Sequence, residues 1–325
     1  MPVGLAFQRK HRKLGYMLKY ISYVVRRRDV LQKKVKCGTA YPDKTIYIIK
    51  PDYQDGVEGV LSLLYRQLLY IDKAVRNDYI PFVDWKNFRT QYYDEINNAW
   101  DYFFKQPSWI KEDEVYQCKN VYLSGWTFRD INPKGLFGAD VFFNSELKND
   151  CVSLFQKYIK LSDEIVNIVE DEAQRLNIEE CIGVYVRGTD YVKLKPSGEY
   201  VQPTVNQVIP VIHTFLEKYG NERGIYLVTE DGEIYDSLYE EFGEKIKLVS
   251  FDSFVRGYTG QAVLSRSNVL NADKKKRGQD YLAKMVFLSK CKYLISSVTQ
   301  GSKFSYILNG GEYRDEYIFN LGLYK

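Results

Sequence analysis

The sequence has little of the material from which several kinds of catalytic centre are built. It contains only two histidines, His11 and His213, in 325 residues. A hydrolase triad or a multi-histidine metal centre therefore has almost no residues from which to form. His213 also lies in a run with the apolar spacing of a helix, which favours a packed or half-exposed histidine over a catalytic one.

Cysteines and long apolar runs are scarce as well. The five cysteines are odd in number, scattered and never spaced as C-x-x-C, which argues against a disulfide framework and against a zinc site. No apolar run approaches the length of a membrane span, and we find no signal-peptide pattern at the start of the chain. We therefore expect a cytoplasmic protein, and 325 residues allow two domains of ordinary size.

Positive charge is concentrated at one end of the chain. Residues 1–36 hold eleven Lys or Arg and one acid, whereas the rest is mildly acidic. Apolar residues recur there at steps of three and four, so an N-terminal arm (1–37) is expected to form a helix with one apolar stripe. Such a helix could lie on an anionic membrane, each base adding about 1 kcal/mol, or pack on the body. A nucleic-acid arm is disfavoured, because no binding motif follows.

Beyond the arm, strand and helix patterns alternate. β-branched and aromatic residues at 44–50 and 80–84 predict two strands on either side of a helix that begins at Val60, a βαβ unit. In the second half, strands are predicted at 182–186, 225–228, 246–249 and 293–296, with helices at 204–219, 233–242 and 279–290. The predicted fold class is α/β, with two Rossmann-like domains (38–170 and 171–325) that face a cleft. One long helix at 154–176 is expected to lead into the second domain.

The strand at 182–186 ends in Arg187-Gly188-Thr189-Asp190. In an open α/β sheet this carboxyl edge is where ligands bind. An arginine there can fork onto a phosphate, and Asp190 can orient it. The alternative is an ordinary Arg–Asp pair that closes a surface turn.

Two further strand ends are expected to meet the first at the same edge. One carries Glu230 and Asp231, whose carboxylates can reach ribose hydroxyls or base N–H groups. The other carries Thr299 and Ser302, whose hydroxyls, together with a helix N-terminus, can hold phosphate oxygens. The combined edge suits a nucleoside diphosphate.

The segment GVYVRGTDYV, from Gly183 to Val192, resembles the His-x-Arg-x-x-Asp motif of the fucosyltransferase superfamily, which includes bacterial α1,2- and α1,6-fucosyltransferases and protein O-fucosyltransferases. The resemblance implies a two-domain GT-B enzyme that uses GDP-fucose without a metal and binds its diphosphate through the arginine, here Arg187. Tyr185 stands where the family has histidine. Residues 38–170 would be the acceptor-side domain and 171–325 the donor-binding domain.

The stretch from Arg277 to Ser289 is similar to the C-terminal motif of the same family. An acid that the family often uses for the guanine base falls at Lys284, with Asp280 one turn earlier. Asp280 is therefore the expected contact to the base, and the identity of the nucleotide is left open.

The expected chemistry needs charge at the leaving diphosphate and a base for the acceptor hydroxyl. No Asp-x-Asp metal signature ends a strand, so we expect no metal, and Arg187 with the Thr299–Ser302 loop would stabilise the leaving group. Glu199 is the expected catalytic base, with Asp190 as the alternative; Glu199 could equally be a solvent-exposed loop acid. Residues 251–277, which include a basic run, would form a loop that closes over the donor, or else a solvated surface loop.

The sequence thus predicts a metal-independent, inverting glycosyltransferase. It would transfer fucose from GDP-fucose to a polysaccharide or lipid-linked glycan at the cytoplasmic face of the membrane. One alternative is the same fold with another nucleotide sugar. The other is a non-catalytic protein that binds a glycan or a nucleotide.

Overall fold

The computed structural model describes residues 32–52, 56, 58–125, 131–132, 134–260, 264 and 273–325. Most of the basic arm (1–31) lies outside the described residues, so its helix and its membrane contact stay predictions. Within the part of the arm that is described, Lys33–Val35 form strand β1. No described helix is both long enough and apolar enough to span a bilayer.

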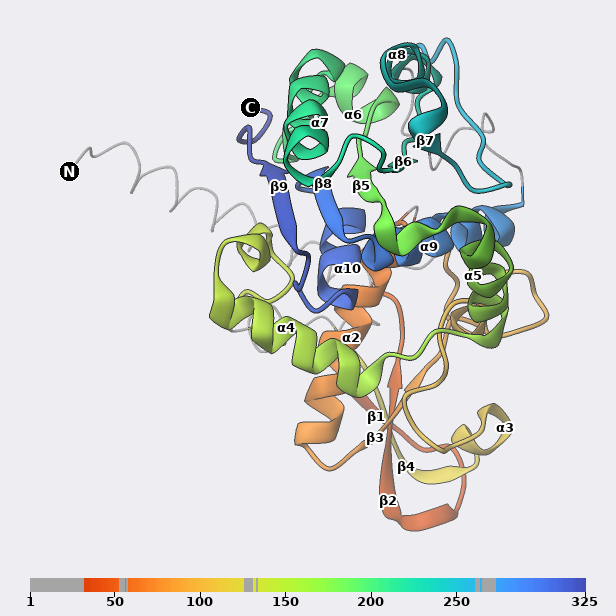
Figure 1. Cartoon of the computed structure of the whole chain (residues 1–325). Coiled ribbons are helices and arrows are strands. Elements are labelled where there is room, and N and C mark those ends of the chain that lie inside the picture. The colour runs from red at the N-terminus through yellow and green to blue at the C-terminus, as the bar shows by residue number, and fades with distance from the viewer. Residues whose placement is uncertain are drawn as a thin grey trace.

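The first sheet contains the predicted βαβ unit (Figure 1, lower half). Its strand order is β1-β4-β2-β3, with β2 (Ala40–Ile49), β3 (Ile80–Val83) and β4 (Cys118–Leu123). Both β3 and β4 run parallel to β2, whereas β1 pairs antiparallel with β4. Helix α2 (Val60–Arg76) connects β2 to β3, as the apolar spacing from Val60 predicts.

The second sheet is parallel throughout, in the order β7-β6-β5-β8-β9. Its strands are β5 (Ile182–Tyr185), β6 (Ile225–Val228), β7 (Ile246–Lys247), β8 (Tyr293–Ser297) and β9 (Asp315–Phe319). Its helices are α6 (Thr189–Leu194), α7 (Val205–Tyr219), α8 (Gly232–Phe242), α9 (Lys274–Lys290) and α10 (Gln300–Leu308). The chain moves outward from β5 first on one side and then on the other, which is the doubly wound arrangement, with its switch point between β5 and β8.

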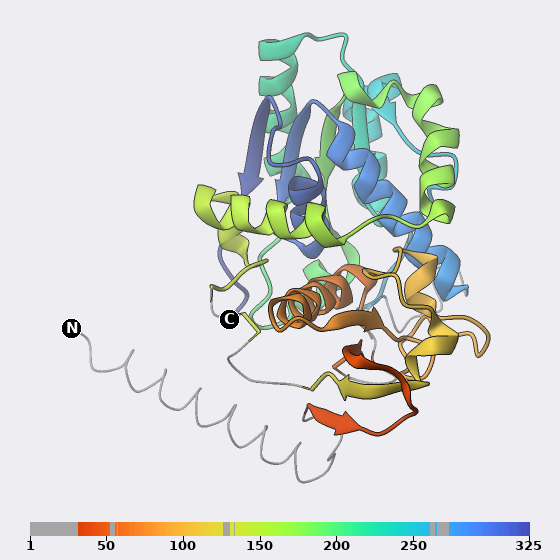
Figure 2. The same cartoon turned by 90° about the horizontal axis from the view of Figure 1, so that it is seen from below.

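The two sheets lie on either side of a shared helical layer. Figure 2 shows α2 and α10, together with α4 (Ser145–Tyr158), between the sheets. One apolar cluster runs through this layer, from Ile49 in the first sheet, across α2 and α10, to Leu294 in the second. Separate clusters fill the outer faces, beneath α7 and α8 on the second sheet and around Ile48 and Phe82 on the first. The predicted α/β architecture with two parallel-sheet units is confirmed, and the units share their core.

The single long helix predicted at 154–176 is wrong. The chain forms two helices there, α4 and α5 (Asp163–Leu176). The first ends because Ile159 is extended, and the second begins at Ser162, whose side chain accepts a hydrogen bond from the Ile165 amide. Helix α4 packs against α10 and α2, whereas α5 packs against α9. The proposed domain boundary at residue 170 falls within α5.

The basic run Lys274 to Arg277 was expected in an irregular loop but begins α9 instead. Asp273 caps this helix by accepting a hydrogen bond from the Lys276 amide at 3.0 Å. Short helices occupy η2 (Ala99–Tyr102), α3 (Glu112–Val115), η3 (Ala139–Phe142), η4 (Ile178–Glu180) and η5 (Gly243–Lys245).

Candidate functional site

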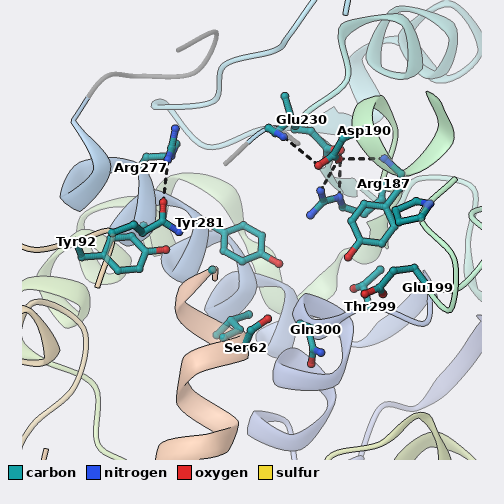
Figure 3. Close-up of a pocket in the computed structure, with 17 residues that line it drawn as sticks. Ser62, Tyr92, Arg187, Asp190, Glu199, Glu230, Arg277, Tyr281, Thr299 and Gln300 are labelled. Carbon is teal, nitrogen blue, oxygen red and sulfur yellow. Dashed lines mark hydrogen bonds and ion pairs between the residues drawn. The ribbon is translucent and has the colours of Figure 1, made fainter. Parts of the chain in front are cut away.

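A cavity of about 410 Å³ opens at the carboxyl edge of the second sheet and is lined by both halves of the chain (Figure 3). The first half contributes the start of α2, with Leu61 and Ser62, and the loop after β3, with Gln91 and Tyr92. The second half contributes the ends of β5, β6 and β8 and the first turns of α9 and α10. The predicted residues at this cavity are Arg187, Asp190, Glu199, Glu230 and Thr299.

Arg187 is the fixed cation of the cavity. Its Nη2 donates to Asp190 Oδ1 at 2.8 Å, and its Nε lies 3.2 Å from Glu230 Oε1 in an ion pair without hydrogen-bond geometry. The guanidinium also lies over the Tyr191 ring, 4.4 Å from its centroid. With only 20% of its side chain exposed, Arg187 is held in one orientation, and the cavity receives a pre-oriented positive charge.

The turn after Arg187 is strained and is locked by acids of the neighbouring strand. Thr189 has φ of 42°, which a β-branched residue rarely adopts and which costs about 1–3 kcal/mol. Its amide donates to Asp231 Oδ2 at 2.8 Å, and its hydroxyl donates to Glu230 Oε1 at 2.9 Å. A Cβ at Gly188 would lie 2.3 Å from Asp231 Oδ2, so the close approach needs glycine. Such strain, held by specific partners, is typical of functional turns.

Asp190 uses both of its oxygens within the protein. Oδ1 accepts from Arg187 and from the Tyr191 amide, and Oδ2 accepts from the Leu264 amide at 3.1 Å. An acid engaged in this way orients the arginine and is poorly placed to take a proton from an acceptor hydroxyl. The geometry therefore makes Asp190 a group that orients Arg187.

Glu199 lines the cavity from the loop that follows α6, on the side where Thr299 lies (Figure 3). Its side chain is exposed, and its carboxylate makes no hydrogen bond or ion pair among the described residues. A carboxylate without an internal partner is available to a bound hydroxyl.

Two helix N-termini point toward this cavity. Gly59, the N-cap of α2, has no side-chain cap, and Ser62 in the first turn lines the cavity. Thr299 caps α10 by accepting from the Ser302 amide at 3.0 Å, and Gln300 faces the cavity. Helix N-termini carry partial positive charge, so their convergence on Arg187 gives a site for an anion with more than one charged group.

A smaller hollow of about 100 Å³ adjoins the cavity and shares Glu230, Arg277 and Tyr281 with it. Asp280 and Lys284 line this hollow. Asp280 accepts from the Lys276 ammonium at 2.5 Å, and Lys284 is ion-paired with the buried Asp252. The hollow therefore presents a mixed set of polar groups beside the main cavity.

Two predicted contacts lie outside both hollows. Ser302 is fully buried, and its hydroxyl donates to the Ser297 carbonyl at 2.6 Å. Asp231 Oδ1 accepts hydrogen bonds from the amides of Glu233 and Ile234, at 2.9 and 3.3 Å, and so caps α8. Both residues support the loops that carry the cavity residues. Among the described residues no group of three or more His, Cys, Asp or Glu is arranged to hold a metal ion.

Several lining residues were not named as site residues from the sequence. Arg277 reaches the cavity from the first turn of α9, and its Nη2 donates to Gln91 Oε1 at 3.3 Å. Tyr92 holds the start of α2 by accepting from the Val60 amide at 2.9 Å. Tyr281 lies between the two hollows, with its hydroxyl 3.3 Å from that of Tyr185, and burial raises the pKa of both phenols. Only Arg277 carried a sequence signal, since it begins the segment that is similar to the C-terminal family motif.

No protein-family model matches the chain, and no curated protein matches its sequence. Among solved structures it is similar to the fucosyltransferase NodZ from Bradyrhizobium, at 14% identity over 82% of this chain and 94% of that one, with a TM-score of 0.47. It is also similar to FUT1 of Arabidopsis thaliana in complex with GDP (10% identity, 85% and 70% coverage, TM-score 0.43). A third similar structure is POFUT1 in its apo form (8% identity, 85% and 98% coverage, TM-score 0.44). All three TM-scores lie below 0.5, so no residue role is carried over from these structures to this chain.

Proposed function

We propose that the protein is a metal-independent glycosyltransferase that takes fucose from GDP-fucose and passes it, with inversion, to a hydroxyl of a glycan. The observation that carries the proposal is Arg187, fixed between Asp190 and Glu230 and presented to a cavity between two α/β units. The resemblance of its segment to the fucosyltransferase motif supports the choice of donor.

On the donor side, the diphosphate would lie between Arg187 and the first turns of α2 and α10. Arg277, on the opposite side of the cavity in Figure 3, would complete the charge around it. When the bond between the sugar carbon and the phosphate oxygen breaks, negative charge develops on that oxygen. Oriented cations and N–H dipoles stabilise such charge without reorganising, which lowers the barrier. Glu230 and Asp280 would contact the nucleoside from the smaller hollow.

On the acceptor side, a glycan hydroxyl would attack the anomeric carbon from the face opposite the diphosphate. Its oxygen forms the new bond to carbon, its proton passes to Glu199, and GDP leaves with the bonding electrons. Among the described residues no hydrogen-bond donor occupies the carboxylate oxygens of Glu199, which leaves them open to that proton. A polysaccharide or lipid-linked oligosaccharide at the cytoplasmic face of a membrane is the acceptor class we propose, with residues 1–36 as the membrane contact.

The donor site is tested first by replacing Arg187. Titration of GDP into the Arg187→Ala protein should show binding weakened by about 2–4 kcal/mol, because the diphosphate loses a fully oriented cation. Arg187→Lys keeps the charge but loses the fork, and should weaken binding by roughly tenfold. Arg76→Ala, which breaks an exposed i,i+4 ion pair with Asp72 at the far end of α2, is the matched control and should bind GDP normally.

Thermal shifts with GDP, UDP, CDP and ADP, with and without EDTA, complete this test. A shift with GDP that EDTA does not change, followed by release of GDP from GDP-fucose, is the expected result. A larger shift with UDP or CDP would mean that the donor is a UDP- or CDP-sugar and not GDP-fucose. An activity that EDTA removes and only Mn²⁺ or Mg²⁺ restores would overturn metal independence. Nucleotide binding without any transfer would point to a non-catalytic relative, and full affinity in folded Arg187→Ala would remove Arg187 from the site.

A further inference from the structure

Residues 320–325, which follow β9, run beside the loop that carries Glu199. Leu323 lies opposite Tyr200 in an antiparallel bridge. The Gly198 amide donates to the Tyr324 carbonyl at 3.0 Å, and the Tyr324 amide donates to the Glu199 carbonyl at 2.8 Å. The Val201 amide donates to the Gly322 carbonyl at 2.9 Å. The loop is thus paired, residue by residue, with a segment more than a hundred positions away.

The side chain of Glu199 does not fix its own position. It is exposed, and its carboxylate forms no hydrogen bond or ion pair among the described residues. Beyond Glu199 the loop is anchored at Gln202, whose Oε1 accepts from the Ser297 hydroxyl at the end of β8. Before Glu199 it is anchored at Lys195, whose amide donates to the Tyr191 carbonyl at 3.2 Å. Between these anchors, the Glu199 amide closes a turn on the Pro196 carbonyl at 3.0 Å, and the backbone bonds to residues 322–324 hold that turn against the C-terminal segment and so set where the carboxylate lies in the cavity.

Glycine permits the geometry on both sides of the pairing. Gly198 has φ of 87° and Gly322 has φ of 84°, values that other residues rarely adopt. A Cβ at either position would meet no atom within 4 Å, so the requirement for glycine comes from backbone conformation alone. An alanine at residue 322 would therefore strain the backbone of the segment without a steric clash.

We infer that residues 320–325 act as a strap that positions Glu199 for the transfer reaction. The inference rests on the proposed function, since it takes Glu199 as the base. Each of the three backbone hydrogen bonds contributes only a small part of the total stability, so losing one lets the loop open locally while the sheet beneath it stays folded. A base displaced by about 1 Å can lose up to a hundredfold in rate, whereas a diphosphate bound by Arg187 is unaffected. The strap is a positioning element and does not itself touch the substrate.

The test compares Tyr324→Pro with Tyr324→Phe. Proline removes the amide that donates to the Glu199 carbonyl, whereas phenylalanine keeps that amide and removes only the hydroxyl near the Gln202 amide. Hydrogen exchange of the amides at residues 198 and 201 is measured together with GDP affinity and the rate at which GDP is released from GDP-fucose in water. In Tyr324→Pro we expect fast exchange, GDP affinity within twofold of the parent, and a kcat lower by about tenfold or more. Tyr324→Phe should match the parent in all three measurements.

Gly322→Ala provides a second variant, with Gly243→Ala as its control. Gly243 also has positive φ and open space for a Cβ, but it lies at the end of α8. Both substitutions should lower stability, and only Gly322→Ala should lower kcat. The strap is overturned if exchange at residues 198 and 201 stays slow in Tyr324→Pro, or if exchange accelerates and kcat does not change. If the parent protein releases no GDP, the proposed function fails, and the exchange result alone decides whether residues 320–325 hold the loop.

Discussion

At the scale of the residue, the turn at residues 188–189 sets the orientation of the Arg187 side chain. Thr189 is held at a positive φ because Glu230 and Asp231 accept hydrogen bonds from its hydroxyl and amide. The same Glu230 oxygen accepts from the Gly188 amide at 3.1 Å. The turn therefore depends on the ends of two adjacent strands, and it keeps Arg187 directed at the cavity before any ligand arrives.

Lys303 gives a residue-scale prediction that concerns stability. Its ammonium is buried in the shared core, donates to the Phe137 carbonyl at 2.8 Å and lies over the Tyr65 ring. Burial lowers the pKa of Lys303 to about 8, against a smaller opposing effect of Glu199. Because the unfolded lysine keeps a pKa of about 10.4, the unfolded state holds more protons between these two values. The free energy of unfolding should therefore rise with pH from about 8 to about 10.4.

The matched variant for this effect is Lys303→Met, which has a similar volume and no titrating group. The difference in unfolding free energy between parent and variant, measured by urea denaturation at several pH values, should move in favour of the parent by up to about 3 kcal/mol over that window. A difference that stays constant across the window would contradict the lowered pKa.

At the scale of the element, helix α8 is tied to the Arg187 turn through its cap. Asp231 accepts from two amides of the first turn of α8 with Oδ1 and from the Thr189 amide with Oδ2. The Asp231 carboxylate thus caps α8 and also holds the strained turn that follows β5, the neighbouring strand. Loss of this side chain removes both functions at once.

We therefore expect Asp231→Ala to lower the free energy of unfolding by about 1–2 kcal/mol and to weaken GDP binding by roughly tenfold, although Asp231 lies outside the cavity lining. Asn144→Ala is the control, because Asn144 caps α4 by accepting from the Leu147 amide at 3.1 Å. It should cost similar stability and leave GDP affinity unchanged. Denaturation curves and GDP titrations of both variants test this prediction. If the two variants bound GDP with equal affinity, the Asp231 side chain would stabilise α8 without affecting the Arg187 turn.

Much of this arrangement could be predicted from local sequence. The apolar runs of β2, β5, β6 and β8 and the spacing of α2, α7 and α8 lie where the patterns place them. The break between α4 and α5 was missed because apolar residues continue through Ile159 and Leu161, so periodicity alone showed one helix. Strand β9 was missed because its sequence, DEYIF, is short and lacks a buried apolar run: only its last residue is buried.

Some residues that line the cavity could be located from chain-local features, whereas others reach it only through packing. Arg187 and Glu230 follow directly from strand ends, which a sequence locates well. Asp231 caps α8, and Ser302 accepts a hydrogen bond from the Thr299 amide at 2.9 Å as the second half of the α10 capping box, so both side chains are directed at helix amides and away from the cavity. Tyr92 and Gln91 reach the cavity only because the first sheet docks against the second.

At the scale of the whole molecule, the two sheets are joined by one apolar core. Phe304 of α10 is fully buried and packs edge-to-face against Phe155 of α4, with ring centroids 5.6 Å apart. Tyr65 of α2 stacks on Phe137 at 4.9 Å. Domains joined by small polar interfaces move independently, whereas a large apolar interface couples them.

Calorimetry should therefore show a single unfolding transition. Phe304→Ala should cost about 3–5 kcal/mol and shift that transition as a whole, because the cavity it leaves lies in the layer that both sheets share. Phe242→Ala, in the outer cluster beneath α8, is a control for a large buried ring away from the shared layer. Two transitions, of which only one moves in Phe304→Ala, would mean that the halves fold separately.

The shared core also limits how such a protein could be recombined. A chimera that joins residues 1–170 of one such protein to residues 171–325 of another would cut through α5 and would separate α2 from the α10 surface that it covers. Each half would then expose apolar faces shaped for a partner that is no longer present. A workable exchange would transfer α2, α4 and α10 as one unit, so both walls of the cavity are exchanged together unless the loops alone are replaced.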